Sequence, residues 1–159
     1  MPALNPKNSS TQYKLRNEQY YIDILAPEIG KPSGKPVYIS QFNTYATPLR
    51  FLDYLLEEIE PAVMPYGVGV LVNVPNPARF ALHKLVVSQG RTLADKIKTQ
   101  KDINQASQVL EVLFDSRPGA VIAAFTAAEF VGGRFMQQLG VALKLLPKHV
   151  QCAWKEWIG

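Results

Sequence analysis

The chain has one cysteine among its 159 residues, Cys152, which excludes a framework of internal disulfides and is typical of a reducing compartment. Its two histidines and single cysteine also make a poor ligand set for zinc. The longest apolar run, residues 120–128, is about half of the ~20 residues that a membrane-spanning helix needs. The first eight residues lack the apolar segment of a secretory signal. These absences predict a cytoplasmic protein without a membrane span.

A strong charge of either sign is absent as well. Seventeen Lys and Arg against thirteen Asp and Glu give a net charge of +4, and 47% of the residues are hydrophobic. This composition is ordinary for a globular domain, and the length allows a sizeable core. The mild positive charge favours anionic partners without identifying one.

The first half of the chain has mainly the pattern of β-strands. Segments rich in Tyr, Ile, Leu and Val predict strands over residues 12–16, 19–26, 37–42 and 68–74. One exception is Pro48–Glu58, where the spacing of four leucines predicts a helix. We therefore expect residues 1–75 to form a β-rich part with one helix at about 48–58.

The second half has helical spacing throughout. Its predicted helices, separated by Gly and Pro, cover residues 77–89, 99–115, 118–131 and 134–146, and a short aromatic tail at 154–157 packs back. A strand-rich half followed by a helical half predicts an α+β fold, with a small mixed or antiparallel sheet and a C-terminal helical bundle. Residues 1–75 and 76–159 are expected to form one compact unit.

The most informative segment runs from Asn76 to Leu85. Asn76 can cap the helix that starts at Pro77, a residue suited to the first helical position. Lys84 lies on a mostly apolar face of this helix, so its ammonium must snorkel to water, pair with an acid or meet a bound anion. A snorkelling lysine at the helix margin and a functional lysine both fit the pattern.

Asp102 can supply that acid, although a local role also fits. Thr99 and Asp102 have the spacing of a capping box, in which the acid reaches back to the N-terminus of the helix. Alternatively, Asp102 lies on the same side as Ala106 and Val109 and faces inward, toward the helix that carries Lys84.

A run of basic residues lies between these two helices, at Arg91, Lys96, Lys98 and Lys101. It is either a solvated surface or a surface that attracts a triphosphate or a nucleic acid.

Asp23 is the third candidate residue. It lies in a predicted strand, where it alternates with Tyr21 and Leu25 on one face while Ile22 and Ile24 take the other. Because a charged Asp is rarely buried without a partner, it is either an edge-strand residue in water or a metal ligand or general base.

These segments, in this order, resemble the C-terminal part of bacterial polymerase-β-like nucleotidyltransferases, closest to the uncharacterised and the abortive-infection or toxin-type branches. The matching stretches are residues 21–25, 48–55, 76–85, 101–103 and 110–111. The resemblance implies transfer of a nucleoside monophosphate from an NTP to an acceptor hydroxyl or phosphate, with Mg²⁺ as cofactor.

The resemblance also implies roles for individual residues. Asp23 would match the third catalytic carboxylate, which helps to hold Mg²⁺ and activates the acceptor. Lys84 would match the helical lysine that contacts the nucleotide phosphates, with Lys101 as a second binding residue. Asp102 would match the acid of an Arg/Lys-Asp motif in the next helix.

Two motifs of that family are missing. The chain contains no Gly-Ser dipeptide and no Asp-x-Asp before Asp23, where Glu18 is the only acid. We therefore expect that residue 1 lies downstream of the nucleotide-binding core, in a truncated or split form that is inactive alone. The alternative is a non-catalytic interaction or scaffold module that forms a homodimer or binds a partner chain. Nucleic-acid binding through the basic run is the weaker third option.

Overall fold

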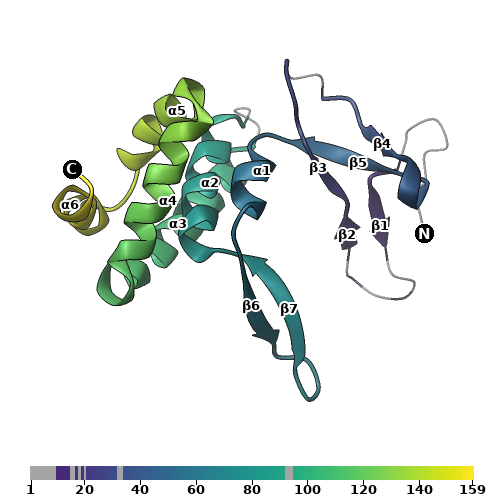
Figure 1. The fold of residues 1–159 in the computed structure, drawn as a ribbon, viewed down its shortest axis with the longest axis horizontal. Coiled ribbons are helices and arrows are strands. Elements are labelled where there is room, and N and C mark those ends of the chain that lie inside the picture. The colour runs from purple at the N-terminus through teal and green to yellow at the C-terminus, as the bar shows by residue number, and fades with distance from the viewer. Residues whose placement is uncertain (1–9, 15–16, 18, 20, 32–33, 92–94) are drawn as a thin grey trace. The chain divides into compact units, whose positions relative to one another are not determined.

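The computed structural model describes residues 10–14, 17, 19, 21–31, 34–91 and 95–159 (Figure 1). The chain forms two compact units, Met1–Leu52 and Asp53–Gly159. The predicted boundary after residue 75 stays a prediction about domain organisation. Small sheets come first and helices follow, which confirms the α+β class.

The first unit contains two small sheets. Strands β1 (Gln12–Lys14) and β2 (Tyr21–Asp23) pair antiparallel, with Gln12 opposite Asp23. The predicted strand over residues 19–26 is interrupted at Ile24, whose N–H donates to the Thr11 carbonyl at 2.9 Å while its carbonyl accepts from the Thr47 N–H at 2.8 Å. Ile24 is therefore the point where the chain passes from one sheet to the other.

The second sheet of this unit has three strands, with the longest in the middle. Its members are β3 (Leu25–Pro27), β4 (Val37–Ile39) and β5 (Thr44–Leu49). β5 pairs parallel to β3 and antiparallel to β4. A short 3-10 turn, η1 (Ser40–Phe42), takes up the end of the segment predicted as a strand over residues 37–42.

The helix predicted over Pro48–Glu58 is mostly wrong. β5 continues to Leu49, Phe51 has a left-handed φ of 58°, and only α1 (Leu52–Leu56) is helical. The leucine spacing is compatible with a helix, but Pro48 lies in the strand and the left-handed residue separates the two elements.

The second unit begins with a β-hairpin that the sequence predicts only in part. Strands β6 (Ile59–Met64) and β7 (Val70–Pro75) pair antiparallel from Ile59 opposite Pro75 to Met64 opposite Val70. β6 contains Pro61 and a glutamate, which hide its strand pattern. Figure 1 shows the hairpin extending away from the helices of its own unit.

The helices form the rest of this unit. Their bounds are α2 (Pro77–Gln89), α3 (Lys96–Ser116), α4 (Pro118–Val131), α5 (Gly133–Leu143) and α6 (Lys148–Trp157). The predictions for α2 and α4 are confirmed at both ends. α3 begins one turn before the predicted start, α5 ends earlier than predicted, and the aromatic tail is part of α6.

α2 lies at the centre of the helical core and packs against α3, α4 and α5. Its buried residues occur on nearly every side, and Leu82 and Leu85 are completely inaccessible. A stripe through Phe80, Lys84 and Val87 keeps partial exposure. Lys84 therefore lies on the one side of α2 that reaches the surface. No helix in the described part of the chain is long and apolar enough to cross a membrane.

Candidate functional site

The site centres on Asp102, which α3 directs toward α2. Only 3% of Asp102 is exposed, and its carboxylate accepts a hydrogen bond from the Lys84 ammonium at 2.9 Å. The ammonium also lies 5.4 Å from the centre of the Phe80 ring, within the range of a cation–π contact. The structure thus brings together two of the three residues singled out in the sequence.

Arg91 is the second cation on the same carboxylate. It follows the end of α2, and its Nε and terminal nitrogen donate to Oδ2 of Asp102 at 2.8 and 2.7 Å. Lys84 and Arg91 are seven residues apart, and Arg91, two residues past the end of α2, reaches the same carboxylate as Lys84. This spacing could have identified Arg91 as a partner of Asp102. The sequence interpretation instead grouped Arg91 with the neighbouring lysines as a basic run.

Burial and charge act in opposite directions on Asp102. Burial opposes ionisation of the carboxyl, but hydrogen bonds from Lys84 and Arg91, together with their charges, outweigh it and hold its pKa below the ordinary value. One carboxylate thus faces two cations, which leaves the cluster with one excess positive charge. The side chains of Lys84 and Arg91 remain 27% and 29% exposed, so this charge is open to solvent.

The capping-box interpretation of Asp102 is wrong. α3 begins at Lys96, so Thr99 lies inside the helix, and its hydroxyl donates to the Asp95 carbonyl one turn back at 3.2 Å. Asp102 is consequently within the helix, where it faces the neighbouring helix, as the alternative interpretation predicts.

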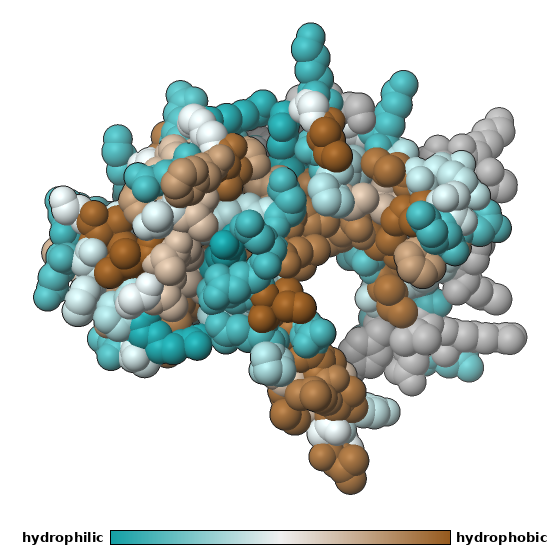
Figure 2. Space-filling model, viewed as in Figure 1, coloured by the Kyte–Doolittle hydropathy of each residue, from teal (hydrophilic) through white to brown (hydrophobic). Residues whose placement is uncertain are grey.

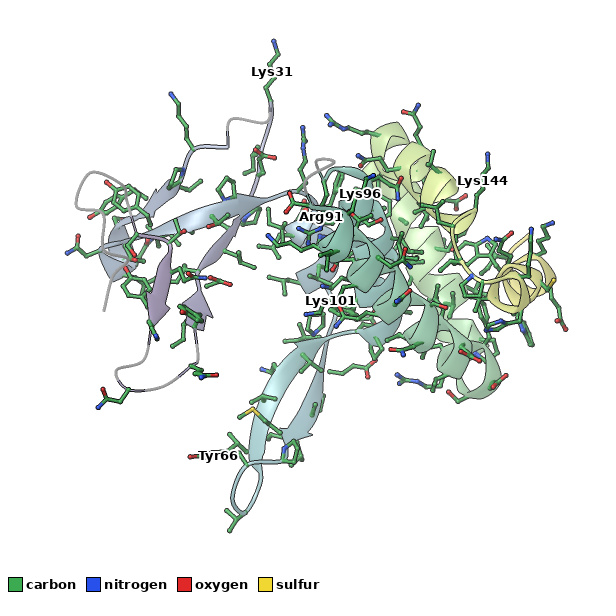
Figure 3. The ribbon with its side chains drawn as sticks, turned by 180° about the vertical axis from the view of Figure 1, so that it is seen from behind. Lys31, Tyr66, Arg91, Lys96, Lys101 and Lys144 are labelled. Carbon is green, nitrogen blue, oxygen red and sulfur yellow. The ribbon has the colours of Figure 1, made fainter. Side chains whose placement is uncertain are left out.

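The basic run lies at the same end of the helix pair. Figure 3 shows Arg91 and Lys96 where α2 ends and α3 begins, with Lys101 further along α3. Lys101 is exposed, and Lys98 forms an ion pair with Asp95 at 3.2 Å. These lysines add positive charge beside the cluster of Lys84, Arg91 and Asp102.

Asp23 lies at the end of β2 in the first unit, whereas Lys84 and Asp102 belong to the second. It is exposed and accepts a hydrogen bond from Nε2 of Gln12 at 2.6 Å. Asp23 is therefore an exposed carboxylate on a small two-stranded sheet, hydrogen-bonded to Gln12, the residue that pairs with it across the sheet.

The described residues do not fit a complete Mg²⁺ centre. None of their His, Cys, Asp and Glu side chains form a group of three that could hold an ion. A two-metal site needs several carboxylate oxygens close together, and Asp23 alone supplies one group.

A second polar network surrounds the start of α2. Asn76 accepts the N–H groups of Ala78 and Arg79 at 2.9 and 3.3 Å, which confirms the predicted cap. Its amide donates to Glu58 and Glu60 at 3.2 and 3.0 Å. The network therefore anchors the base of the hairpin to α2.

Arg79 completes this network from a buried position. Its guanidinium donates to Glu57 at 2.6 Å, Glu58 at 3.2 Å and the Tyr54 carbonyl at 2.9 Å, and it lies 4.9 Å from the Tyr54 ring. Burial raises the pKa of the Tyr54 hydroxyl well above its usual range, although Arg79 lowers it. The contacts of Arg79 with these partners indicate a structural role.

The comparison with protein families identifies the relationship. A family described as Nucleotidyltransferase matches residues 1–129, which cover the first unit, the second unit as far as residue 129, and the residues Asp23, Lys84 and Asp102. The chain belongs to this nucleotidyltransferase family. Comparisons with curated proteins and with solved structures give no match. Within the nucleotidyltransferase match lie the two helices that carry the Lys84, Arg91 and Asp102 cluster, whereas α5 and α6 follow it.

Proposed function

We propose that the chain binds the phosphate groups of a nucleoside triphosphate with Lys84 and Arg91, as part of nucleotidyl transfer to an acceptor. The observation that carries this proposal is the convergence of two partly exposed cations on one buried carboxylate, in a member of a nucleotidyltransferase family. In this proposal Asp102 is a positioning residue, because it holds both cations and leaves a net positive charge.

Both cations keep hydrogen-bond donors for a ligand. An ammonium has three N–H donors and a guanidinium has five, and Asp102 uses one of the first and two of the second. Phosphate oxygens are strong acceptors for such donors, especially for the planar fork of an arginine. Exposed Lys101 adds charge that would attract a triphosphate to this surface.

Asp23 and Mg²⁺ form the second part of the proposal. Mg²⁺ often takes one or two protein carboxylates and completes its shell with substrate phosphates and water. A role for Asp23 as one of these carboxylates rests on the resemblance in sequence. Assignment to the polymerase-β-like or toxin-type branch, and inactivity of this chain alone, rest on the resemblance in sequence.

Titration calorimetry of the full chain with ATP and with inorganic triphosphate, each with and without Mg²⁺, tests phosphate binding. The variant Lys84→Met should weaken both ligands about tenfold or more, because a hydrogen bond from a charged group contributes roughly 1.5–3 kcal/mol. Lys144→Met is the matched control, since Lys144 is exposed on the C-terminal side of α5 and Figure 3 shows it away from Arg91. Its affinity should equal that of the wild type.

Two results would reject the proposal: no binding of ATP or triphosphate by the full chain, or equal affinities for wild type and Lys84→Met. A circular-dichroism melt of each variant separates loss of a contact from loss of the fold. Release of labelled product from ATP carrying an α-phosphate label then reports transfer by this chain.

The second candidate function is an interaction module, and a separate observation favours it. The β6–β7 hairpin exposes a large apolar surface that a monomer would leave in water. Such a surface is compatible with nucleotide binding elsewhere in the same unit, so the two functions do not exclude each other.

A further inference from the structure

The β6–β7 hairpin exposes several large apolar side chains in the helical unit. Figure 2 shows it as a hydrophobic projection. The large apolar side chains on its strands and loop are between 41% and 107% exposed: Ile59, Val63, Met64, Tyr66, Val68, Val70 and Leu71. A two-stranded hairpin of this kind is marginally stable by itself in water. An exposed apolar surface of this kind is typical of an interaction site.

The hydrogen-bond pattern shows which backbone groups of the hairpin are unused. The Asn76 N–H donates to the Glu58 carbonyl at 2.9 Å, in the register that pairs Ile59 with Pro75. Hydrogen-bonded pairs and non-hydrogen-bonded pairs alternate along an antiparallel ladder. Glu58 and Asn76 form a hydrogen-bonded pair, so the next pair, Ile59 and Pro75, and every second pair after it direct their backbone groups outward. Pro61 and Pro75 occupy outward positions, where a missing N–H costs no ladder bond.

The two edges of the hairpin therefore differ. On β6 the outward positions are Ile59, Pro61 and Val63, and Pro61 interrupts the donors in the middle. On β7 the outward positions Leu71 and Asn73 both keep an N–H and a C=O. Among the described strands, only β6 pairs with β7, so this edge is open.

The absence of charged side chains from most of the hairpin limits the kinds of partner that it can bind. Residues 61–78 contain no charged side chain. A nucleic acid or a charged peptide would find nothing to neutralise there, whereas an identical uncharged hairpin meets no repulsion. An edge with two outward residues centred on Val72 is also complementary to itself under two-fold symmetry.

We propose that a second copy of this chain binds the open edge of the hairpin, with β7 pairing antiparallel to β7 of the second copy about Val72. Leu71 then lies opposite Asn73 of the second copy and exchanges both backbone hydrogen bonds with it, and the symmetric pair does the same. Val72 lies opposite Val72 of the second copy. This proposal does not depend on nucleotide binding.

The arrangement is closed. It produces one four-stranded sheet in the order β6–β7–β7–β6, whose outer edges carry Pro61 and resist further addition. Antiparallel pairing brings the base of one hairpin to the tip of the other, so the two helical layers lie at opposite ends of the sheet.

The oligomeric state of the full chain, measured by sedimentation velocity over a range of concentrations, is the first test. Wild type should be a dimer. Asn73→Pro removes an outward N–H without touching the hairpin ladder, opposite a position where β6 already has Pro61, and should shift the chain to a monomer. Val63→Pro, the matched change on the β6 edge, should remain a dimer.

A cross-link tests the register directly. In a background of Cys152→Ser, which removes the one free and exposed cysteine, Val72→Cys should form an intermolecular disulfide on mild oxidation. Opposed residues of a non-hydrogen-bonded pair have Cα atoms about 4.5 Å apart, within the range of a disulfide. Position 74 lies on the same face as position 72. In this register, however, the Cα atoms of residue 74 in the two chains are about 13 Å apart, so Val74→Cys should not cross-link.

A monomeric wild type at tens of micromolar would overturn the proposal, and so would a dimer that Asn73→Pro leaves intact. Cross-linking of Val74→Cys with equal efficiency would overturn the register. Far-ultraviolet circular dichroism confirms that each variant is folded before its oligomeric state is compared.

Discussion

The Lys84 ammonium on α2 lies 2.9 Å from the carboxylate of Asp102 on α3, and Asp102 is 3% exposed. The pair joins the central helix of the unit to the longest helix at a point where both would otherwise bury charge. Arg91 adds the second cation, so Asp102 is held from both of its oxygens. The same contacts that stabilise the helix pair also orient the two cations proposed to bind phosphate.

The substitution Asp102→Asn should lower the free energy of unfolding by about 2–3 kcal/mol, because it leaves two cations without their anion. Loss of one partner from a fully buried pair costs roughly 3–5 kcal/mol, and the partial exposure of Lys84 and Arg91 reduces this. Urea unfolding at neutral pH measures the change. Asp115→Asn, an exposed acid on the same helix, is the control and should stay within about 0.5 kcal/mol of wild type.

The stabilisation by Asp102 should also disappear in acid. Its pKa in the folded protein lies below the ordinary value of 3.8, so the folded state favours the charged form. The contribution is complete above that value and is lost as the pH falls through the lowered pKa. The difference in stability between wild type and Asp102→Asn should therefore shrink between pH 7 and pH 3. A difference that is equal at both pH values would contradict this assignment.

Much of the helical unit can be predicted from the sequence, because its signals are local. Asn76 and Pro77 mark the start of α2, and the apolar positions around Lys84 predict that its ammonium reaches water, an acid or a bound anion. Asp102 can be that acid by its position relative to Ala106. The structure confirms this approach of the two helices, and the catalytic roles of the residues stay predictions.

The rest depends on contacts that local patterns do not encode. Ile24 ends one strand because its N–H and carbonyl bond to two different segments, and nothing in its neighbours indicates a change of sheet. Pro61 suppresses the strand signal of β6, although an outward-facing proline is harmless there. The start of α3 was obscured by the capping-box spacing of Thr99 and Asp102, which lies one turn inside the helix.

A further prediction concerns the replacement of Asn76 by aspartate, which is also a good N-cap residue but should destabilise the fold here. Asp and Asn are similar N-caps in general, and loss of such a cap costs about 1 kcal/mol. Here the Asn76 amide also donates to Glu58 and Glu60, which an aspartate cannot do. Asn76→Asp should therefore be at least as destabilising at pH 7 as Asn76→Ala, because it places a third negative charge beside two others. Thermal unfolding compares them, and a stable Asn76→Asp would show that the glutamates do not matter.

The final prediction concerns Arg79, whose contacts depend on the planar shape of its guanidinium as well as on its charge. Its side chain is 9% exposed, donates to the Tyr54 carbonyl at 2.9 Å and lies over the Tyr54 ring. Arg79→Met keeps much of the apolar contact and should cost about 1–3 kcal/mol through the lost hydrogen bonds. Arg79→Lys keeps the charge but cannot reproduce the fork, so a poorly paired cation remains buried.

Arg79→Lys should consequently be as destabilising as Arg79→Met or more so, contrary to the usual ranking of conservative changes. Urea unfolding of both variants measures this order. Arg117→Met is the matched control, since the side chain of Arg117 is half exposed and pairs with Glu60 at 3.4 Å. Its effect should stay below about 1 kcal/mol, as for other surface ion pairs. A fully stable Arg79→Lys would mean that charge alone, rather than the directed hydrogen bonds, holds the base of the hairpin to α2.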